Sequence, residues 1–197
     1  MNEPGLRARK RLRTRNQIAE AALAAFMAKG YDATTLEEIA ETAEVHKRTL
    51  LRYFPTKTHL VLYRQHAAFE QFQAALAERG DTPVIDVWQG HVVEHSRALM
   101  KRGPAANIGR LAMNEPAVRQ AVLDIRQQYL RAVARALDEE AGGSLQGRVR
   151  SRVVAAALVG GNYAVADMVM REEAYADLEA AELEVIRLVR EGLLTPG

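Results

Sequence analysis

Apolar residues recur at helical spacing along almost the whole chain, and no segment shows the alternating β-branched pattern that is typical of a strand. The first periodic segment has apolar positions at Ile18, Ala22, Ala25 and Phe26, and Gly30 follows where a helix C-cap belongs. The pattern predicts an all-helical protein with about nine helices.

Capping residues and prolines set the expected helix boundaries. Thr34 and Thr35 precede Glu37 and Glu38, as in a capping box, and Thr56 precedes the next long apolar pattern. Further along the chain, prolines mark the first turns of the predicted helices. The predicted helices cover residues 12–29, 35–43, 47–53, 57–79, 83–102, 104–113, 116–140, 145–171 and 176–193.

The net charge of +2 is unevenly distributed. Residues 1–64 hold 12 Lys and Arg against 7 Asp and Glu, whereas residues 65–197 hold 15 against 18. Six cations lie within the first 15 residues: Arg7, Arg9, Lys10, Arg11, Arg13 and Arg15. A basic arm beside a small basic domain favours nucleic acid as a partner, with a solvated tail as the alternative.

The rest of the composition excludes several kinds of functional site and several classes of protein. The chain has no cysteine, so disulfides, thiolate metal sites and cysteine nucleophiles are excluded, and a cytoplasmic location is expected. The longest apolar run, Val153–Val159, is far below the ~18 to 20 residues that span a bilayer, so no membrane span is expected. Because no nucleophile elbow, phosphate-binding glycine loop or dinucleotide fingerprint occurs, the chain is expected not to be an enzyme and to need no cofactor.

Residues 34–57 carry the most informative motif. Two short predicted helices, joined by the tight segment 43–46, have the dimensions of a helix-turn-helix, whose second helix enters the DNA major groove. Apolar residues such as Ile39, Val45 and Leu50 would hold the two helices together. The second helix also carries Lys47, Arg48, Thr49 and Arg52, which predict a cationic outer face.

This segment resembles the tetracycline-repressor (TetR) family of bacterial transcription regulators. The resemblance rests on Phe26, Lys29-Gly30-Tyr31, Thr34-Thr35, Ile39-Ala40, Ala43, Val45, Thr49, Tyr53-Phe54 and Lys57. It implies a helix-turn-helix over residues 35–54 in a DNA-binding domain over 12–72, preceded by a disordered arm over 1–11. It further implies an effector-binding and dimerisation domain over 73–197. Glu44 stands where the family turn usually has glycine, so we expect the turn to differ slightly.

By resemblance and chemistry, nine residues are predicted to contact double-stranded DNA. Arg48 is the expected base reader, because a guanidinium pairs bidentately with guanine. Thr35, Tyr53 and Lys57 are expected to contact phosphates, which set register without reading sequence, whereas the sequence favours Thr34 as a helix cap. The full predicted set is Thr34, Thr35, His46, Lys47, Arg48, Thr49, Arg52, Tyr53 and Lys57.

The segment 145–193 predicts a homodimer interface. Ala156, Gly160 and Ala164 form a row of small residues at four-residue spacing, which lets two helices approach closely. Packing within one chain is the alternative. The predicted seam consists of Ala156, Gly160, Ala164, Leu178, Ala181, Val185, Leu188 and Val189.

Polar or aromatic residues within otherwise apolar helices are candidate liners of a site for an apolar small-molecule effector. They are His66, Trp88, His91, His95, Asn107, Tyr129 and Asn162. His91, Glu94 and His95 also match the H-x-x-E-H pattern of some zinc proteases. The leading interpretation is a dimeric repressor that an effector releases from a palindromic operator. A metal-sensing regulator, or less favourably a metal-dependent hydrolase, is the alternative.

Overall fold

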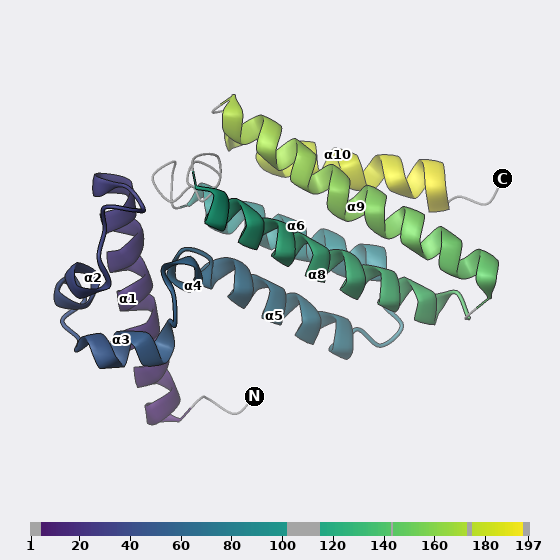
Figure 1. Cartoon of the computed structure of the whole chain (residues 1–197). Coiled ribbons are helices and arrows are strands. Elements are labelled where there is room, and N and C mark those ends of the chain that lie inside the picture. Colours follow the sequence, from purple (N-terminus) through teal and green to yellow (C-terminus); the bar gives the residue numbers. More distant parts are fainter. Residues whose placement is uncertain (1–4, 102–114, 143, 173–174, 195–197) are drawn as a thin grey trace. The chain divides into compact units, whose positions relative to one another are not determined.

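The computed structural model describes residues 5–101, 115–142, 144–172 and 175–194. These residues are helical throughout and contain no strand, which confirms the all-helical prediction (Figure 1). They divide into two compact units, with the described parts of 1–64 and 110–121 in unit 1 and those of 65–109 and 122–197 in unit 2. The predicted helix at 104–113, including Asn107, lies outside the described residues.

Unit 1 is built around its first helix. Its elements are α1 (Leu6–Lys29), α2 (Leu36–Thr42), α3 (Lys47–Tyr53), α4 (Lys57–Val61) and the first residues of α5 (Tyr63–Glu78). Helix α1 packs against α2 and α4, and α2 packs against α3. Fully buried side chains from each part form the core, including Ile18, Phe26, Ile39, Leu50 and Phe54.

The first helix begins earlier than predicted. Helix α1 starts at Leu6, so residues 6–11 of the expected disordered arm are helical. Leu, Arg and Lys are all good helix formers and nothing after Gly5 interrupts them, so the helix continues toward the N-terminus beyond its packed part. The basic residues of this segment are therefore held on a helix.

The predicted long helix over 57–79 is interrupted. Helix α4 ends at Val61, and α5 begins at Tyr63 after Leu62, whose φ of −94° and ψ of 10° depart from helical geometry. Thr56 caps α4 as predicted, because its side chain accepts a hydrogen bond from the His59 amide. Since Leu60, Val61 and Leu62 are all buried, the local bend keeps three consecutive apolar residues out of water.

Unit 2 contains most of α5, together with α6 (Val84–Met100), α8 (Pro116–Glu140) from Val122 onward, α9 (Leu145–Arg171) and α10 (Leu178–Val189). Helix α10 packs along α9 and α6 (Figure 1). The bounds of α8 and α9 agree with the prediction. The last predicted helix is instead a 3₁₀ turn at Tyr175–Asp177, then α10, then a π-helical turn at Arg190–Leu194.

One described stretch, Leu145–Val169 of α9, is long and apolar enough to cross a membrane by length and composition alone, with a mean hydropathy of 1.2. The sequence prediction considered only uninterrupted apolar runs and so missed it. A core helix of a helical protein passes the same test. Helix α9 packs against α10 and buries the polar side chains of Ser151 and Asn162, which suits a core helix.

Candidate nucleic-acid interface

Helices α2 and α3 form the predicted helix-turn-helix. The turn between them places Glu44 in the left-handed region, with φ of 51°. The Glu44 amide donates to the Glu41 carbonyl over 3.0 Å, and the Val45 amide donates to the Ala40 carbonyl over 2.9 Å. Glu44 thus adopts a positive φ that glycine accepts more readily, because the flanking hydrogen bonds and the buried Ala43 fix the backbone.

We expect Glu44→Gly to stabilise the protein. A left-handed conformation costs a residue with a Cβ about 1 to 2 kcal/mol, part of which glycine offsets by its greater freedom in the unfolded chain. The expected gain in the free energy of unfolding is therefore about 0.5 to 1 kcal/mol, measured by urea denaturation. Glu41→Gly is the matched control, because Glu41 lies within α2 and glycine there should cost about 1 kcal/mol. Equal losses from both variants would contradict the strain at Glu44.

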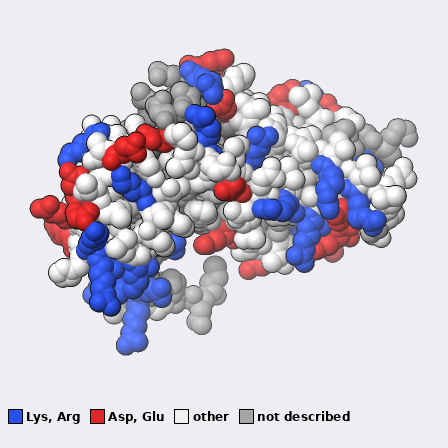
Figure 2. Space-filling model, viewed as in Figure 1, with Lys and Arg blue, Asp and Glu red and all other residues white. Residues whose placement is uncertain are grey.

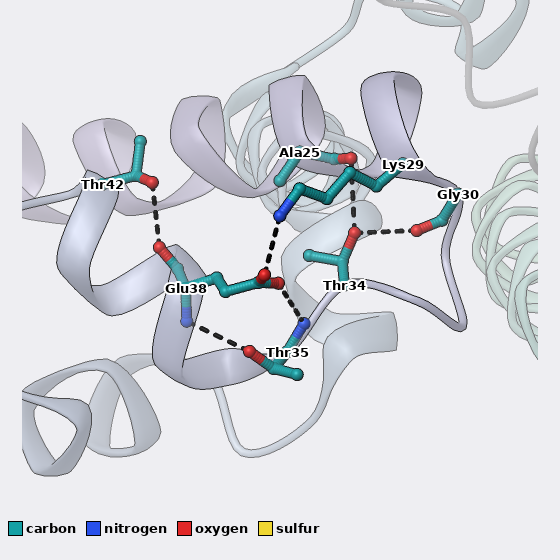
Figure 3. A network of polar contacts seen from close by, with 7 residues as sticks. All are labelled: Ala25, Lys29, Gly30, Thr34, Thr35, Glu38 and Thr42. Atoms are coloured by element: carbon teal, nitrogen blue, oxygen red, sulfur yellow. Dashed lines mark hydrogen bonds and ion pairs between the residues drawn. The ribbon is translucent and has the colours of Figure 1, made fainter.

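A capping box fixes the start of α2 (Figure 3). The Glu38 amide donates to Thr35 Oγ1 over 3.2 Å, and the Thr35 amide donates to Glu38 Oε2 over 3.0 Å. Lys29 Nζ of α1 donates to Glu38 Oε1 over 2.7 Å and, with the cap, lowers the pKa of Glu38 to about 2. Thr35 thus stays exposed at the N-terminus of α2 while its hydroxyl accepts the cap bond.

Thr34 was included in the predicted DNA contacts, but its burial corrects that assignment. Its side chain is fully buried, and its hydroxyl lies 2.7 Å from the Gly30 carbonyl and 3.3 Å from the Ala25 carbonyl (Figure 3). These carbonyls belong to the last turn of α1, where helical partners run out. Thr34 therefore caps the C-terminal end of α1, whereas the sequence favoured Thr34 as a cap at the start of the following helix.

The cations on the outer face of α3 differ in the partners that they contact within the protein. The ammonium of Lys47 donates to the Glu37 carboxylate of α2 in a short contact. Arg52 lies over the Tyr53 ring, with its guanidinium carbon 5.4 Å from the ring centroid. Arg48 is exposed and has no hydrogen bond or ion pair with any other described residue, so its whole donor edge is open to a partner.

The other predicted DNA contacts differ in their exposure and in whether their side chains already form hydrogen bonds within the protein. Thr49 and Tyr53 are half-buried on α3, and the exposed His46 is the N-cap residue without a side-chain cap bond. Lys57 Nζ donates to the carbonyls of Tyr31 and Asp32 over 2.9 and 3.1 Å. The ammonium of Lys57 would have to leave these carbonyls, or share its protons with them, to contact a phosphate.

The N-terminal turns of α1 add positive charge to the same unit. Figure 2 shows Lys and Arg side chains gathered at the lower left, where Figure 1 places α3 and the first turns of α1. Arg15 lies over two buried rings, 4.6 Å from the Tyr63 centroid and 5.8 Å from the Phe54 centroid. Arg15 therefore helps to hold α1 against the segment that follows α3.

Four of the candidate effector residues of unit 2, Trp88, His91, His95 and Tyr129, lie in one aromatic cluster. Tyr129 of α8 lies 5.2 Å from His91, 5.7 Å from Trp88 and 5.5 Å from Phe72, measured between ring centroids. His95 stacks on His91 at 6.1 Å. Of the other described candidates, His66 is half-buried.

Asn162 and Trp88 are already hydrogen-bonded to groups of the protein. The Trp88 indole N–H donates to Asn162 Oδ1 over 2.9 Å, and Asn162 Nδ2 donates to the Glu182 carbonyl over 2.9 Å. Since both residues are almost fully buried, they link α6, α9 and α10. Neither polar group is free for a ligand.

The metal alternative gains no support. His91 and His95 lie together, but Glu94 is exposed on another face of α6. Burial, with a smaller electrostatic contribution from the neighbouring His95, lowers the pKa of His91 to about 3, so the His91 imidazole is neutral at physiological pH. Among the described residues no group of three His, Asp or Glu side chains is placed to hold a metal ion.

The predicted dimer seam divides into two sets. Leu178 and Val189 are buried in the core of their own unit, which corrects their assignment to an interface. Ala156, Ala164 and Leu188 are exposed, whereas Gly160, Ala181 and Val185 are intermediate. Helix α9 also exposes large apolar side chains: Val149, Val153 and Met168.

Three features escaped the sequence prediction because they depend on contacts between distant helices. Arg126 of α8 lies over the Tyr163 ring of α9 at 5.7 Å. Glu182 of α10 is buried against Ser96 of α6. Gly161 rather than Gly160 faces α10, since a Cβ there would lie 2.5 Å from Val185 Cγ1. A polar residue on the apolar stripe of α10 was the one available sign of the Glu182 site.

The helix-turn-helix of unit 1 defines a DNA-binding class of fold, and comparison with known proteins agrees. Residues 18–63 match the family of bacterial regulatory proteins named after TetR. A segment of 85 residues is 48% identical to the HTH-type transcriptional regulator TcmR of Streptomyces glaucescens, covering 42% of this chain and 38% of that protein. These matches support the TetR family and concern the N-terminal part of the chain, residues 18–63 in the family match. The chain matches little more than a third of the length of its first curated relatives.

Solved structures extend the likeness to the whole chain. The TetR regulator TylP from Streptomyces fradiae is 26% identical with a TM-score of 0.67, covering 94% of this chain and 89% of that one. The fatty acid degradation regulator FadR from Bacillus halodurans has a TM-score of 0.64 at 19% identity, covering 99% and 100%. The latter likeness concerns the fold alone.

Proposed function

We propose that this protein is a dimeric transcriptional repressor that binds a palindromic operator through α3 and is released by a small molecule. The observation that carries the proposal is the two-sided structure of α3. Leu50 is fully buried against the core, whereas Arg48 is exposed and makes no hydrogen bond or ion pair with any other described residue. A helix packed on one side and cationic on the other is what major-groove reading requires.

The contacts divide by role. Arg48 reads a base, because its open guanidinium can donate two parallel hydrogen bonds to guanine. Tyr53 at the end of α3 and Thr35 at the N-cap of α2 position the helices on phosphates. Lys57 joins them if its ammonium exchanges carbonyl partners for a phosphate. His46, Lys47, Thr49 and Arg52 complete the proposed surface.

Dimerisation follows from the exposed apolar face of α9. Val149, Val153, Ala156, Gly160 and Ala164 succeed one another at three- or four-residue spacing on a helix. This row is partly exposed in one chain, and a second copy would bury it. A two-fold dimer presents two α3 helices, which selects a palindromic site.

Effector control is assigned to unit 2, whose aromatic cluster supplies an apolar environment with a few polar groups. An effector releases DNA only to the extent that it binds one arrangement of the two recognition helices better than the other, and such a coupling is typically about 1 to 3 kcal/mol. The proposed domain boundary near residue 72, the lack of enzymatic activity and a cytoplasmic location belong to the same proposal.

Selection of binding sites from a pool of randomised DNA duplexes tests this function. We expect the wild-type protein to enrich one palindromic sequence, with half-sites about one helical turn apart. Sedimentation of the bound complex should give two chains per duplex. Enrichment of no sequence above the starting pool would contradict the proposal.

A further inference from the structure

Arg126 is a half-buried cation without a counter-charge among the described residues. Its guanidinium lies over the Tyr163 ring and approaches α9 closely, since a Cβ on Gly160 would lie 3.3 Å from Arg126 Nη2. The described part of the chain places no carboxylate within ion-pair distance of it. A cation–π contact engages the face of a guanidinium, so its N–H edge remains able to pair with a planar anion.

Two phenol hydroxyls accompany this cation. Tyr129 is one turn further along α8 and almost fully buried, and no hydrogen bond ties its hydroxyl to another described residue. Burial and the neighbouring Tyr163 raise the pKa of Tyr129, and burial raises the pKa of Tyr163 to about 12. Both phenols therefore stay protonated at neutral pH and can donate hydrogen bonds to an anion.

Tyr129 is also part of the aromatic cluster of unit 2. Phe72, Trp88 and His91 surround it at centroid distances between 5.2 and 5.7 Å. His91 is neutral, so Arg126 supplies the positive charge at this end of the cluster. The arrangement places one cation and two hydroxyl donors beside a set of rings, which is complementary to a flat apolar molecule with one negative end.

We propose that Arg126, Tyr129 and Tyr163 bind the carboxylate of an anionic aromatic effector. The ring system of this effector packs against the rings of Phe72, Trp88 and His91. The inference rests on the proposed effector-responsive regulator and refines its apolar ligand to an aromatic acid. Arg126 pairs with the carboxylate through its free edge, and the phenols donate the remaining hydrogen bonds.

Isothermal titration calorimetry of the full chain without DNA tests the site, with 2-naphthoate and its uncharged analogue 2-naphthamide as probes. We expect wild-type protein to bind 2-naphthoate roughly 10-fold or more tightly than 2-naphthamide. Arg126→Gln should weaken 2-naphthoate binding roughly 10- to 100-fold and leave 2-naphthamide unchanged, since a hydrogen bond to a charged group is worth that much. Arg131→Gln is the control, because Arg131 is exposed on the same helix.

Arg126→Lys keeps the positive charge but loses the planar guanidinium, so this variant should retain part of the preference for 2-naphthoate. The lysine variant keeps the test valid if thermal melting shows that Arg126→Gln is unfolded. Equal affinity of wild-type protein for both probes, no binding of 2-naphthoate, or an equal loss in the Arg131 control would overturn the proposal. Since these titrations contain no DNA, their failure would leave the DNA-binding proposal standing, and failed site selection would leave the ligand site standing.

Discussion

Replacing Glu182 with glutamine should raise the free energy of unfolding by about 2 to 3 kcal/mol at pH 8, and by much less at pH 5. Glu182 of α10 is only 7% exposed, and burial raises the pKa of its carboxyl to about 7. The nearby Glu179 carboxylate, which is itself paired with Arg97, also raises the pKa of Glu182. Ionised Glu182 is therefore an unfavourable charge in the native state.

The direction of the pH dependence follows from proton uptake. Between the unfolded pKa of about 4.5 and the native pKa of about 7, the folded chain holds a proton on Glu182 that the unfolded chain has lost. The contribution of this group to stability is complete below pH 4.5 and disappears as the pH rises to about 7. Ser96 opposes part of this shift, because its hydroxyl donates to the Glu182 carboxylate and so lowers the pKa of Glu182, while burial raises that pKa by more.

Urea denaturation of the wild-type and Glu182→Gln proteins at pH 5 and pH 8 measures both effects. Glu184→Gln is the matched control on α10, since Glu184 is exposed and paired with Arg187, and its loss should change stability by less than about 1 kcal/mol. If Glu182→Gln were no more stable than wild type at pH 8, Glu182 would not be the buried acid that the structure describes.

Alanine at two adjacent glycines of α9 should have opposite effects. At Gly161 a new Cβ would lie 2.5 Å from Val185 Cγ1 of α10, so one helix must shift. Valine has little rotamer freedom in a helix and cannot yield easily. Overpacking of this kind costs about 1 to 3 kcal/mol, whereas replacing a helical glycine with alanine gains about 1 kcal/mol. Gly161→Ala should therefore lower the free energy of unfolding by about 1 kcal/mol.

Gly160→Ala is the control, because the one group near its new Cβ is the flexible end of Arg126, 3.3 Å away. This variant should gain about 1 kcal/mol, so the two alanine variants should differ by about 2 kcal/mol at equal protein concentration. Adding Val185→Ala to Gly161→Ala should recover part of the loss. Stabilisation by both single variants would refute a close approach of α9 and α10 at Gly161.

Local signals in the sequence predicted most of the helical architecture. The bounds of α3, α8 and α9 agree with their predicted ranges, because Pro116, Ser144 and Pro55 act on the backbone within a few residues. The helix-turn-helix was recognisable for the same reason: its apolar and capping positions lie within a continuous segment of about 20 residues.

The remaining features depend on packing between helices that are distant in sequence. Thr34 and Thr35 are chemically alike, and only the fold shows that one is buried under α1 while the other is exposed. Leu178 and Leu188 were assigned to the same interface, yet the first lies in the core and the second at the surface. Arg126 gave no sequence signal, because its significance comes from Tyr163 on another helix.

Selection of DNA sites by wild-type and Arg48→Ala proteins tests the central claim most directly. If α3 reads DNA with Arg48, both proteins should enrich the same palindrome, but the variant should lose discrimination at one position in each half-site, by about 1 to 3 kcal/mol per bidentate pair. Unchanged discrimination at every position by the Arg48 variant would contradict the account.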